Sequence, residues 1–346
     1  MKPQLVVGVA IATALFAAGC ATPVTSPAPA ALPAQSPGPH VTLTTEKTIN
    51  LPGVGGHGDV VVTDPAAHSV YIAQSPDNNL VVLDTATNTV RTVVTGIPSA
   101  NGIAFNDSYV YVAEAPANAV AVIAKSTWQV VATVPSGGKT PDALYADPVD
   151  GAIIVANDDS NNMEEFAASA PFAVRKTLAL RPSPAKTGPD LGTYSAADDR
   201  IYQSDDNDVL VIDAKTLTIQ RVVALPLAAG TAAKDMYYDQ ARHLLWIATS
   251  GPQALALDPA TGAVVDTVKT ASGADQIAAD RDRGLLFLGE GKAGVLGVID
   301  LASHRDIADI KIEPDFHTQD HLASSDLVYA YLNTSNTIAV DKISVQ

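Results

Sequence analysis

Cysteine is almost absent from this chain, since Cys20 is the only one in 346 residues. No intrachain disulfide can therefore form. Basic residues are also scarce, with 21 Lys and Arg against 37 Asp and Glu, which gives a net charge of −16 at pH 7. This acidity disfavours nucleic acid as a partner, because phosphate backbones are bound through clustered cations.

Complete catalytic motifs are missing as well. No Gly-x-Ser-x-Gly nucleophile turn occurs. Residues 136–140 end like a phosphate-binding loop, but Thr133 stands where that loop needs its first Gly. Residues 157–162 are rich in Asn and Asp, yet they lack the spacing and the Gly of an EF-hand calcium loop. The sequence thus favours a binding protein over an enzyme.

The longest uncharged apolar run lies near the N-terminus. Lys2 precedes an apolar run over residues 5–18, which is too short to span a membrane comfortably and is typical of a secretory signal. The residues that lead to Cys20 resemble a bacterial lipoprotein signal, in which the Cys becomes the lipidated first residue. An ordinary cleaved signal is the alternative. We expect residues 1–19 to be removed and Cys20 to be lipidated.

Residues 20–40 have the composition of a tether. They are dominated by Pro, Ala and Ser and carry no acidic or basic residue apart from His40, so they cannot form a core. The neutral Ala21 after Cys20 resembles lipoproteins that reach the outer membrane. We predict an exported, lipid-anchored monomer at the periplasmic face of the outer membrane or at the cell surface, with one folded domain over residues 41–346.

The rest of the chain consists of a repeat of about 43 residues. A short polar step before a small apolar strand recurs at spacings of 43, 40, 48, 45, 40 and 45 residues. Runs of β-branched and aromatic residues follow each step, separated by Asp, Pro and Gly turns. Repeats of this length predict an all-β, seven-bladed β-propeller with four antiparallel strands in each blade. The steps are centred on Asp59, Gly102, Asp142, Asp190, Asp235, Asp275 and Asp320.

The last repeat is one strand short. Only 26 residues follow Asp320, which is enough for three strands. Residues 44–51 precede the first polar step, where the fourth strand of a repeat belongs. We expect this N-terminal strand to complete the seventh blade, because closure of the ring removes two exposed sheet edges.

The second strands share aromatic or β-branched residues followed by a small residue and a polar end, as in residues 71–74, 111–114 and 154–157. Together with third strands of the Val-Ile-Asp type, these segments resemble the YVTN family of β-propellers over about residues 41–346. The resemblance implies a fold more than an activity. Members of that family include binding proteins, scaffolds, and relatives of lactone-cleaving and quinone-dependent propellers.

The polar steps are expected to lie at one mouth of the channel, where the start of strand one meets the end of strand two. Repulsion between neighbouring carboxylates roughly 8 Å apart would cost about 2 kcal/mol per pair. Backbone N–H donors, partial protonation or a bound cation can relieve it, and the recurrence of the Asp favours the first. The predicted ligand-binding residues are His57, Asp59, Glu114, Asp142, Asp190, Asp235, Asp275 and Asp320.

Three histidines depart from the repeat near the junction of blades one and seven. His57 lies two residues before Asp59, and His317 and His321 flank Asp320. His and Asp side chains bind Zn²⁺ and other divalent ions, and they also act in acid–base chemistry. Loop residues without a ligand are the alternative. The predicted metal ligands are His57, Asp59, His317 and Asp320, with Ca²⁺ or Zn²⁺ as the ion.

Two functions are compatible with these features. The first is a cell-envelope binding or scaffold protein that holds a protein, peptide, cation or small molecule at the acidic mouth. The second is a metal-dependent hydrolase that resembles lactonase-type propellers. The lack of a complete catalytic constellation favours the first.

Overall fold

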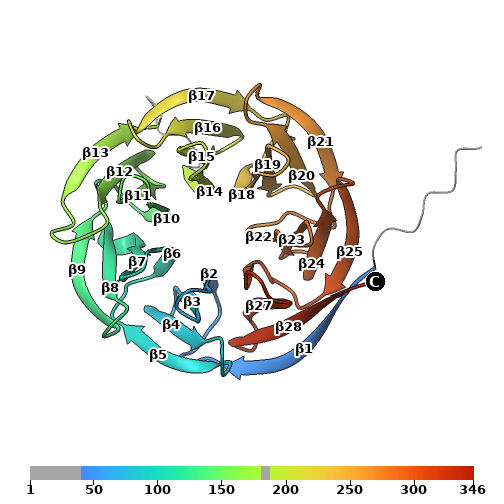
Figure 1. Cartoon of the computed structure of the whole chain (residues 1–346), viewed down its shortest axis with the longest axis horizontal. Helices are drawn as coiled ribbons and strands as arrows, with labels where there is room; N and C mark the ends of the chain where they lie inside the picture. The colour runs from blue at the N-terminus through green and yellow to red at the C-terminus, as the bar shows by residue number, and fades with distance from the viewer. Residues whose placement is uncertain (1–39, 181–187) are drawn as a thin grey trace, which may run out of the picture. The chain divides into compact units, whose positions relative to one another are not determined.

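The computed structural model describes residues 40–180 and 188–346. The predicted signal peptide, Cys20 and nearly all of the tether lie outside the described residues. Seven four-stranded antiparallel sheets follow one another around a ring (Figure 1). The predicted seven-bladed β-propeller is therefore confirmed. Within the described ranges, no helix has the length and apolar character needed to cross a membrane.

Strand order in blades 1 to 6 follows the chain from the centre of the ring to its rim. The strands of blades 1 to 3 are β2 (Gly58–Asp64), β3 (Ser69–Gln74), β4 (Asn79–Asp84) and β5 (Thr89–Thr95); β6 (Ala100–Phe105), β7 (Tyr109–Glu114), β8 (Ala119–Ala124) and β9 (Gln129–Pro135); β10 (Pro141–Asp147), β11 (Ala152–Asn157), β12 (Asn162–Ala167) and β13 (Val174–Ala179). A single short 3-10 helix, η1 (Ala115–Ala117), occurs among the described residues.

The remaining blades repeat this order. Their strands are β14 (Pro189–Ser195), β15 (Arg200–Asp205), β16 (Asp208–Asp213) and β17 (Thr218–Ala224); β18 (Ala233–Asp239), β19 (Leu244–Thr249), β20 (Gln253–Asp258) and β21 (Ala263–Lys269); β22 (Ile277–Asp280), β23 (Leu285–Glu290), β24 (Val295–Asp300) and β25 (Arg305–Lys311); and, for blade 7, β26 (Gln319–His321), β27 (Leu327–Leu332), β28 (Thr337–Val345) and β1 (Val41–Asn50).

Blade 7 is closed by the N-terminal strand, as predicted. β1 pairs antiparallel with β28 from Val41↔Val345 to Asn50↔Thr337, and the two strands lie side by side in Figure 1. The Thr45 hydroxyl donates to the Asp341 carboxylate at 2.6 Å, across 296 residues of sequence. The ring is thus held shut by a β-ladder that runs the length of β1 with one register shift, between Thr45 and Lys47.

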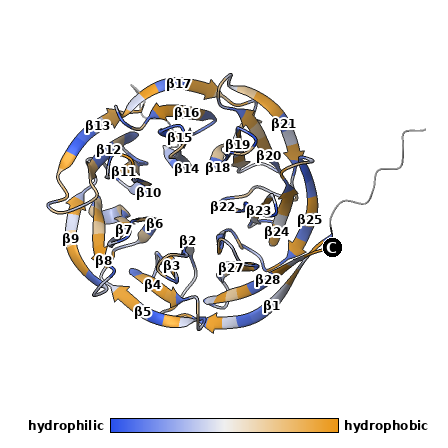
Figure 2. Ribbon diagram, in the orientation of Figure 1, coloured by the Kyte–Doolittle hydropathy of each residue, from blue (hydrophilic) through white to orange (hydrophobic). Residues whose placement is uncertain are grey.

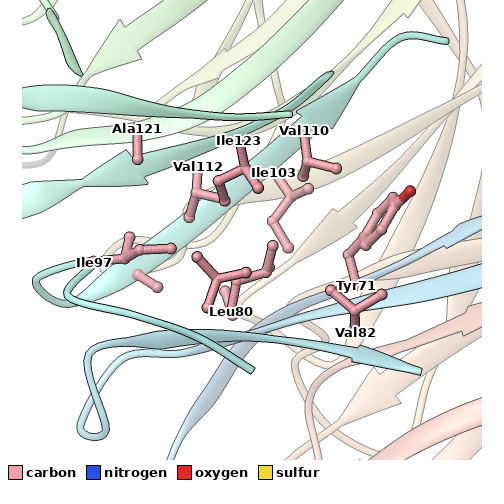
Figure 3. Packing of buried hydrophobic residues seen from close by; sticks show 12 residues of the cluster. Tyr71, Leu80, Val82, Ile97, Ile103, Val110, Val112, Ala121 and Ile123 are labelled. Atoms are coloured by element: carbon pink, nitrogen blue, oxygen red, sulfur yellow. The ribbon is translucent and has the colours of Figure 1, made fainter. Parts of the chain in front are cut away.

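The core lies between successive blades. Between blades 1 and 2, Tyr71 and Leu80 pack against Val112 and Ile123, and all four side chains are fully buried (Figure 3). Burial of each such side chain stabilises the fold by roughly 1.5–3 kcal/mol. The outermost strands, such as β13 and β25, mix hydrophilic and hydrophobic residues because only one of their faces meets the core (Figure 2).

Many of the acidic residues hold turns. Asp84 ends β4, and its Oδ1 accepts hydrogen bonds from the backbone N–H groups of Ala86 and Thr87. Arg91 and Thr87 hold the pKa of this carboxyl at about 2. Asp213 and Asp258 end the third strands of later blades and accept similar bonds. These carboxylates are structural, so the acids near the channel are the ones relevant to binding.

Candidate functional site at the channel mouth

The register between strands one and two shows which residues are equivalent at the mouth. In blade 1, Gly58 pairs with Gln74, and a one-residue bulge follows before Val61 pairs with Ile72. Asp59 lies in this bulge, 15 positions before the last residue of the second strand. Corresponding bulges occur in blades 2 to 5. The bulge therefore fixes one ring position per blade.

Blade 5 differs from the alignment made on sequence. Ala233 pairs with Thr249, the last residue of the second strand. Lys234, and not Asp235, is therefore equivalent to Asp59. A cation thus stands where the sequence pattern predicted an acid.

Blade 7 also differs, by three residues. Gln319 pairs with Ala330, the third residue from the end of β27. This register places His317, and not Asp320, at the ring position. The alignment was wrong here because Asp320 is the nearest Asp to a strand that is only 3 residues long.

In blade 2, Asn101 takes the ring position that was assigned to Gly102. Gly102 has a different role, because a Cβ atom there would fall on the backbone carbonyl oxygen of Asp142 in blade 3. Gly102 thus allows blades 2 and 3 to approach and leaves no gap in the ring. We call the seven equivalent residues the channel ring: Asp59, Asn101, Asp142, Asp190, Lys234, Asp275 and His317.

Gly102→Ala is expected to lower the free energy of unfolding by about 1–3 kcal/mol, because the backbone of blade 3 must move to admit the methyl group. Urea unfolding of both proteins measures the difference. Gly291→Ala is the matched control, since its Cβ would meet nothing closer than 3.4 Å. Equal stability of the two variants would contradict the close approach.

Four carboxylates of the channel ring lie close enough to influence one another. Burial raises the pKa of Asp142 well above its ordinary value of 3.8, and the charges of Asp59, Asp190 and Asp275 raise it further. Asp158, just beyond β11, adds to this effect. The predicted concentration of acid at the mouth is thus present, although Asp235 and Asp320 do not belong to the ring.

Lys234 is the single Lys or Arg in the channel ring. Its Nζ lies 2.5 Å from Asp190 Oδ2 and 3.3 Å from Asp275 Oδ1. Burial favours the neutral amine, but the combined attraction of Asp190 and Asp275 outweighs burial and raises the pKa of Lys234. One ammonium group therefore bridges blades 4, 5 and 6, and it leaves the Asp59 and Asp142 side without a lysine or arginine.

His57 and His317 meet beside Asp59. Their rings stack with centroids 4.7 Å apart, and His57 Nε2 lies 3.3 Å from Asp59 Oδ1. This contact with Asp59 raises the pKa of His57 despite partial burial. The predicted approach of blades 1 and 7 at this point thus brings together His57, Asp59 and His317.

The hydrogen bonds of His317 favour one tautomer. Nδ1 lies 2.7 Å from the carbonyl oxygen of Asp315 and 3.2 Å from the side-chain amide nitrogen of Asn333. The shorter contact is to a group that can only accept, which favours a proton on Nδ1. Nε2 is buried and has no hydrogen-bond partner among the described residues. A nitrogen lone pair is therefore available next to the acidic ring.

Asp320 and His321 lie elsewhere on blade 7. Asp320 Oδ2 accepts hydrogen bonds from the backbone N–H and the hydroxyl of Thr63, at 2.7 and 2.9 Å, which tie blade 7 to blade 1. His321 Nε2 lies 3.1 Å from the Ser325 carbonyl oxygen and 3.6 Å from Asp280. These two residues do not join His57 and Asp59.

Asp235 and Glu114 are part of the wall. Asp235 Oδ1 accepts from the N–H of Met236 at 2.7 Å, and Oδ2 accepts from the N–H of Ile277 at 2.9 Å. Glu114 ends β7 opposite Ala100, where burial raises its pKa. Backbone donors therefore relieve the charge of Asp235, as predicted for the whole set, but the ring acids make few such bonds.

No group of three or more His, Cys, Asp or Glu side chains suited to a metal ion occurs across residues 40–180 and 188–346. Next to the ring, a cavity of about 120 Å³ is lined by residues of the adjoining bulge position, among them Val60, Ala143 and Leu191. The mouth is thus a polar rim over a narrow neck, in which apolar side chains alternate with Asp235 and Gln276.

Lys234 and Asn101 are the ring residues that sequence reasoning missed. A usable signal was present, because the ring residue precedes the end of the second strand by 15 positions in six blades, as from Lys234 to Thr249. Blade 2, with 13 positions from Asn101 to Glu114, has a shorter turn. Counting back 15 positions from the end of the second strand finds Lys234, whereas a search for Asp does not.

Comparison with known proteins agrees with this architecture. None of the curated proteins matches the chain. Hydrazine synthase from Kuenenia stuttgartiensis has a similar fold, with a TM-score of 0.73 and 12% sequence identity over 84% of this chain and 97% of that chain. The sequence model of the YNCE-like beta-propeller family matches residues 39–324. The expected relation to YVTN-type propellers is confirmed at this level, and the chain belongs to the YNCE-like beta-propeller family.

Proposed function

We propose that this protein is an exported lipoprotein, anchored through Cys20, whose propeller binds a cationic ligand at the channel ring. The observation that carries the proposal is that Asp59, Asp142 and Asp190 occupy one equivalent position in their blades, next to Asp275, while Lys234 pairs with Asp190 and Asp275 alone. Burial and the repulsion of Asp59, Asp190 and Asp275 raise the pKa of Asp142. A cation bound beside Asp142 would relieve this repulsion. The ligand would be a polyamine, a basic side chain of a peptide or protein, or a metal ion.

The arrangement of charge supports a site on one side of the ring. Lys234 already neutralises part of the charge of Asp190 and Asp275. Asp59 and Asp142 have no lysine or arginine within ion-pair distance in the described part of the chain. A ligand cation therefore gains most by entering between blades 1 and 3, over Asn101 of blade 2, whose amide can also accept or donate a hydrogen bond.

Titration of the purified protein with spermidine, with Ca²⁺ and with Zn²⁺ at low ionic strength tests this function. At least one probe is expected to raise the melting temperature in a saturable way, because a ligand at 100 times its Kd stabilises a protein by about 2.7 kcal/mol. The affinity should fall as NaCl screens the ring. If none of the three probes changes the melting temperature, the proposal is wrong.

Two substitutions distinguish binding at the channel ring from nonspecific attraction of a cation to the acidic protein. Asp142→Asn should weaken the binding of the active probe at least roughly tenfold, since a charge-assisted contact contributes about 1.5–3 kcal/mol. Asp107→Asn is the matched control, because Asp107 lies on an exposed turn after β6. Equal losses in both variants would show that binding is not at the ring.

A metal-dependent hydrolase is the second candidate, and the free Nε2 of His317 favours it. That lone pair lies beside His57 and Asp59, which are residue types that bind Zn²⁺. Binding of an ion would require the three side chains to move, since they form no metal-binding group as they stand. Zn²⁺ bound in a 1:1 ratio by the native protein, and lost in His317→Ala but not in His321→Ala, would favour this function over polyamine or peptide binding.

A further inference from the structure

The other end of the channel has a second set of features. Two cavities of about 630 and 660 Å³ lie there, and both are lined by Thr193, Tyr237 and Arg281. Lys234 of the ring stands near the start of β18, whereas Tyr237 stands near its end. The second cavity therefore lies away from the acidic mouth, whereas the first extends inward to Asp235 and Gln276, next to the channel ring. Each has the volume of a small-molecule site.

Arg281 differs from the other arginines of these turns. Arg242 and Arg283 each pair with the Asp three residues earlier, at 2.9 and 2.5 Å, and so hold their turns. Arg281 has no carboxylate within ion-pair distance among the described residues. Its guanidinium lies instead over the ring of Tyr237, 5.8 Å from the centroid. The turns of the repeat do not need this arginine, since Pro65 and Pro148 follow the equivalent Asp in blades 1 and 3.

The acids around these cavities are largely occupied. Asp235 and Asp320 line the first cavity, but both carboxylates accept backbone hydrogen bonds from neighbouring strands. Asp239, in the second cavity, pairs with Arg242. Asp282, on the turn beside Arg281, also lines the first cavity, and its carboxylate has no ion-pair partner among the described residues. Because the guanidinium of Arg281 has no carboxylate partner among the described residues, it can pair with a ligand that carries one negative charge.

The walls are suited to an aromatic or apolar body. Tyr194 and Tyr238 line the second cavity, and Met236 and Ile277 line the first. A guanidinium above a tyrosine ring can present in-plane N–H groups to a planar, bidentate acceptor. A phosphate dianion would bring a second negative charge close to Asp282, which favours a carboxylate.

We propose that this end of the channel is a second binding site, for a small organic carboxylate with an aromatic body, and that its carboxylate pairs with Arg281. The site lies apart from the channel ring and does not depend on the function proposed for it. The aromatic body would pack against Tyr237 and the neighbouring tyrosines.

Benzoate is the probe for this site, and its binding to the full protein is measured by calorimetry or ligand-observed NMR. Saturable binding in the millimolar range is expected. Arg281→Gln should weaken it at least roughly tenfold, and Arg281→Lys should lose most of it because the planar pair is gone. Absence of saturable binding to the unsubstituted protein would overturn the proposal, as would equal affinity of Arg281→Gln.

Three controls make the result specific. Arg221→Gln should bind benzoate normally, because Arg221, on β17, donates to the carbonyl oxygen of Ala260 in the turn between β20 and β21 and lines neither cavity. Benzamide, which has the same shape without the charge, should bind at least roughly tenfold more weakly than benzoate. Asp142→Asn should leave benzoate binding unchanged. Tighter binding of phenyl phosphate than of benzoate would overturn the choice of a carboxylate.

Discussion

Lys234→Met is expected to lower the free energy of unfolding by about 2–3 kcal/mol at pH 7. Removal of one partner from a buried ion pair costs about 3–5 kcal/mol, and the exposure of the Lys234 side chain, 30%, reduces this value. The substitution leaves Asp190 and Asp275 without their shared cation, next to Asp59 and Asp142. This would be among the largest effects of any single ring substitution.

The loss of stability in Lys234→Met should be larger at high pH than at low pH. Burial already raises the pKa of Asp190 in the folded protein, and Lys234 opposes that shift. Without the lysine, the folded-state pKa rises further above the unfolded value. When the pKa of an acid is higher in the folded than in the unfolded protein, the acid stabilises the fold at pH values below its unfolded-state pKa. This stabilisation is lost as the pH rises through the folded-state pKa. The difference between Lys234→Met and the original protein should therefore shrink from pH 7 towards pH 4.

Urea unfolding at pH 7, 5.5 and 4 measures this dependence. Lys269→Met is the matched control, because Lys269 is exposed at the end of the outer strand β21. The double variant Lys234→Met with Asp190→Asn should recover part of the loss at pH 7, since it removes one of the uncompensated charges. A loss that is the same at all three pH values would show that Lys234 acts by packing and not by charge.

Asp142→Asn is expected to change stability in the opposite direction, with a gain of about 1–2 kcal/mol at pH 7. The amide keeps the shape of the carboxylate and removes an acid whose ionisation is opposed by burial and by three other ring acids. Asn101 shows that the ring position accepts an asparagine. A more stable protein that no longer binds its cation would be the signature of a binding site maintained at the expense of stability.

The gain should also vanish at low pH. The pKa of Asp142 in the folded protein lies well above 3.8, so the original protein loses stability as pH rises from about 4 to that raised pKa. The asparagine variant does not titrate there. The two stabilities should coincide at pH 4, separate as pH rises, and remain apart above the raised pKa. A destabilised Asp142→Asn at pH 7 would contradict this account.

The fold could be predicted from the sequence because its signals are local and occur seven times. Each second strand combines β-branched and aromatic residues between turn residues, and an error in one repeat is corrected by the others. Even the closing strand was found, at residues 44–51, where the structure has Val41–Asn50. The closure follows from counting strands, which requires no knowledge of side-chain contacts.

The channel ring could be predicted only in part. Asp59, Asp142, Asp190 and Asp275 share one position, as expected, but the sequence alignment did not place Asn101, Lys234 and His317 there. The bulge at the start of strand one inserts a residue that leaves no mark in the hydrophobic pattern. An Asp one to three positions away then appears to continue the series. The burial and mutual repulsion of the ring acids depend on distances between blades. The sequence of a single repeat carries no information about these distances.

The pairing of β1 with β28 has a consequence for the order of assembly. Blades 1 to 6 each consist of strands that are consecutive in the chain, so each can form as soon as its own segment is available. β1 can pair only with β28, which lies almost 300 residues later in the chain, as the 296-residue separation of Thr45 and Asp341 shows. Contacts between such distant segments form late, because loop closure costs entropy before they contribute. During folding the chain would thus present β1 as an unpaired edge until β28 is available to pair with it.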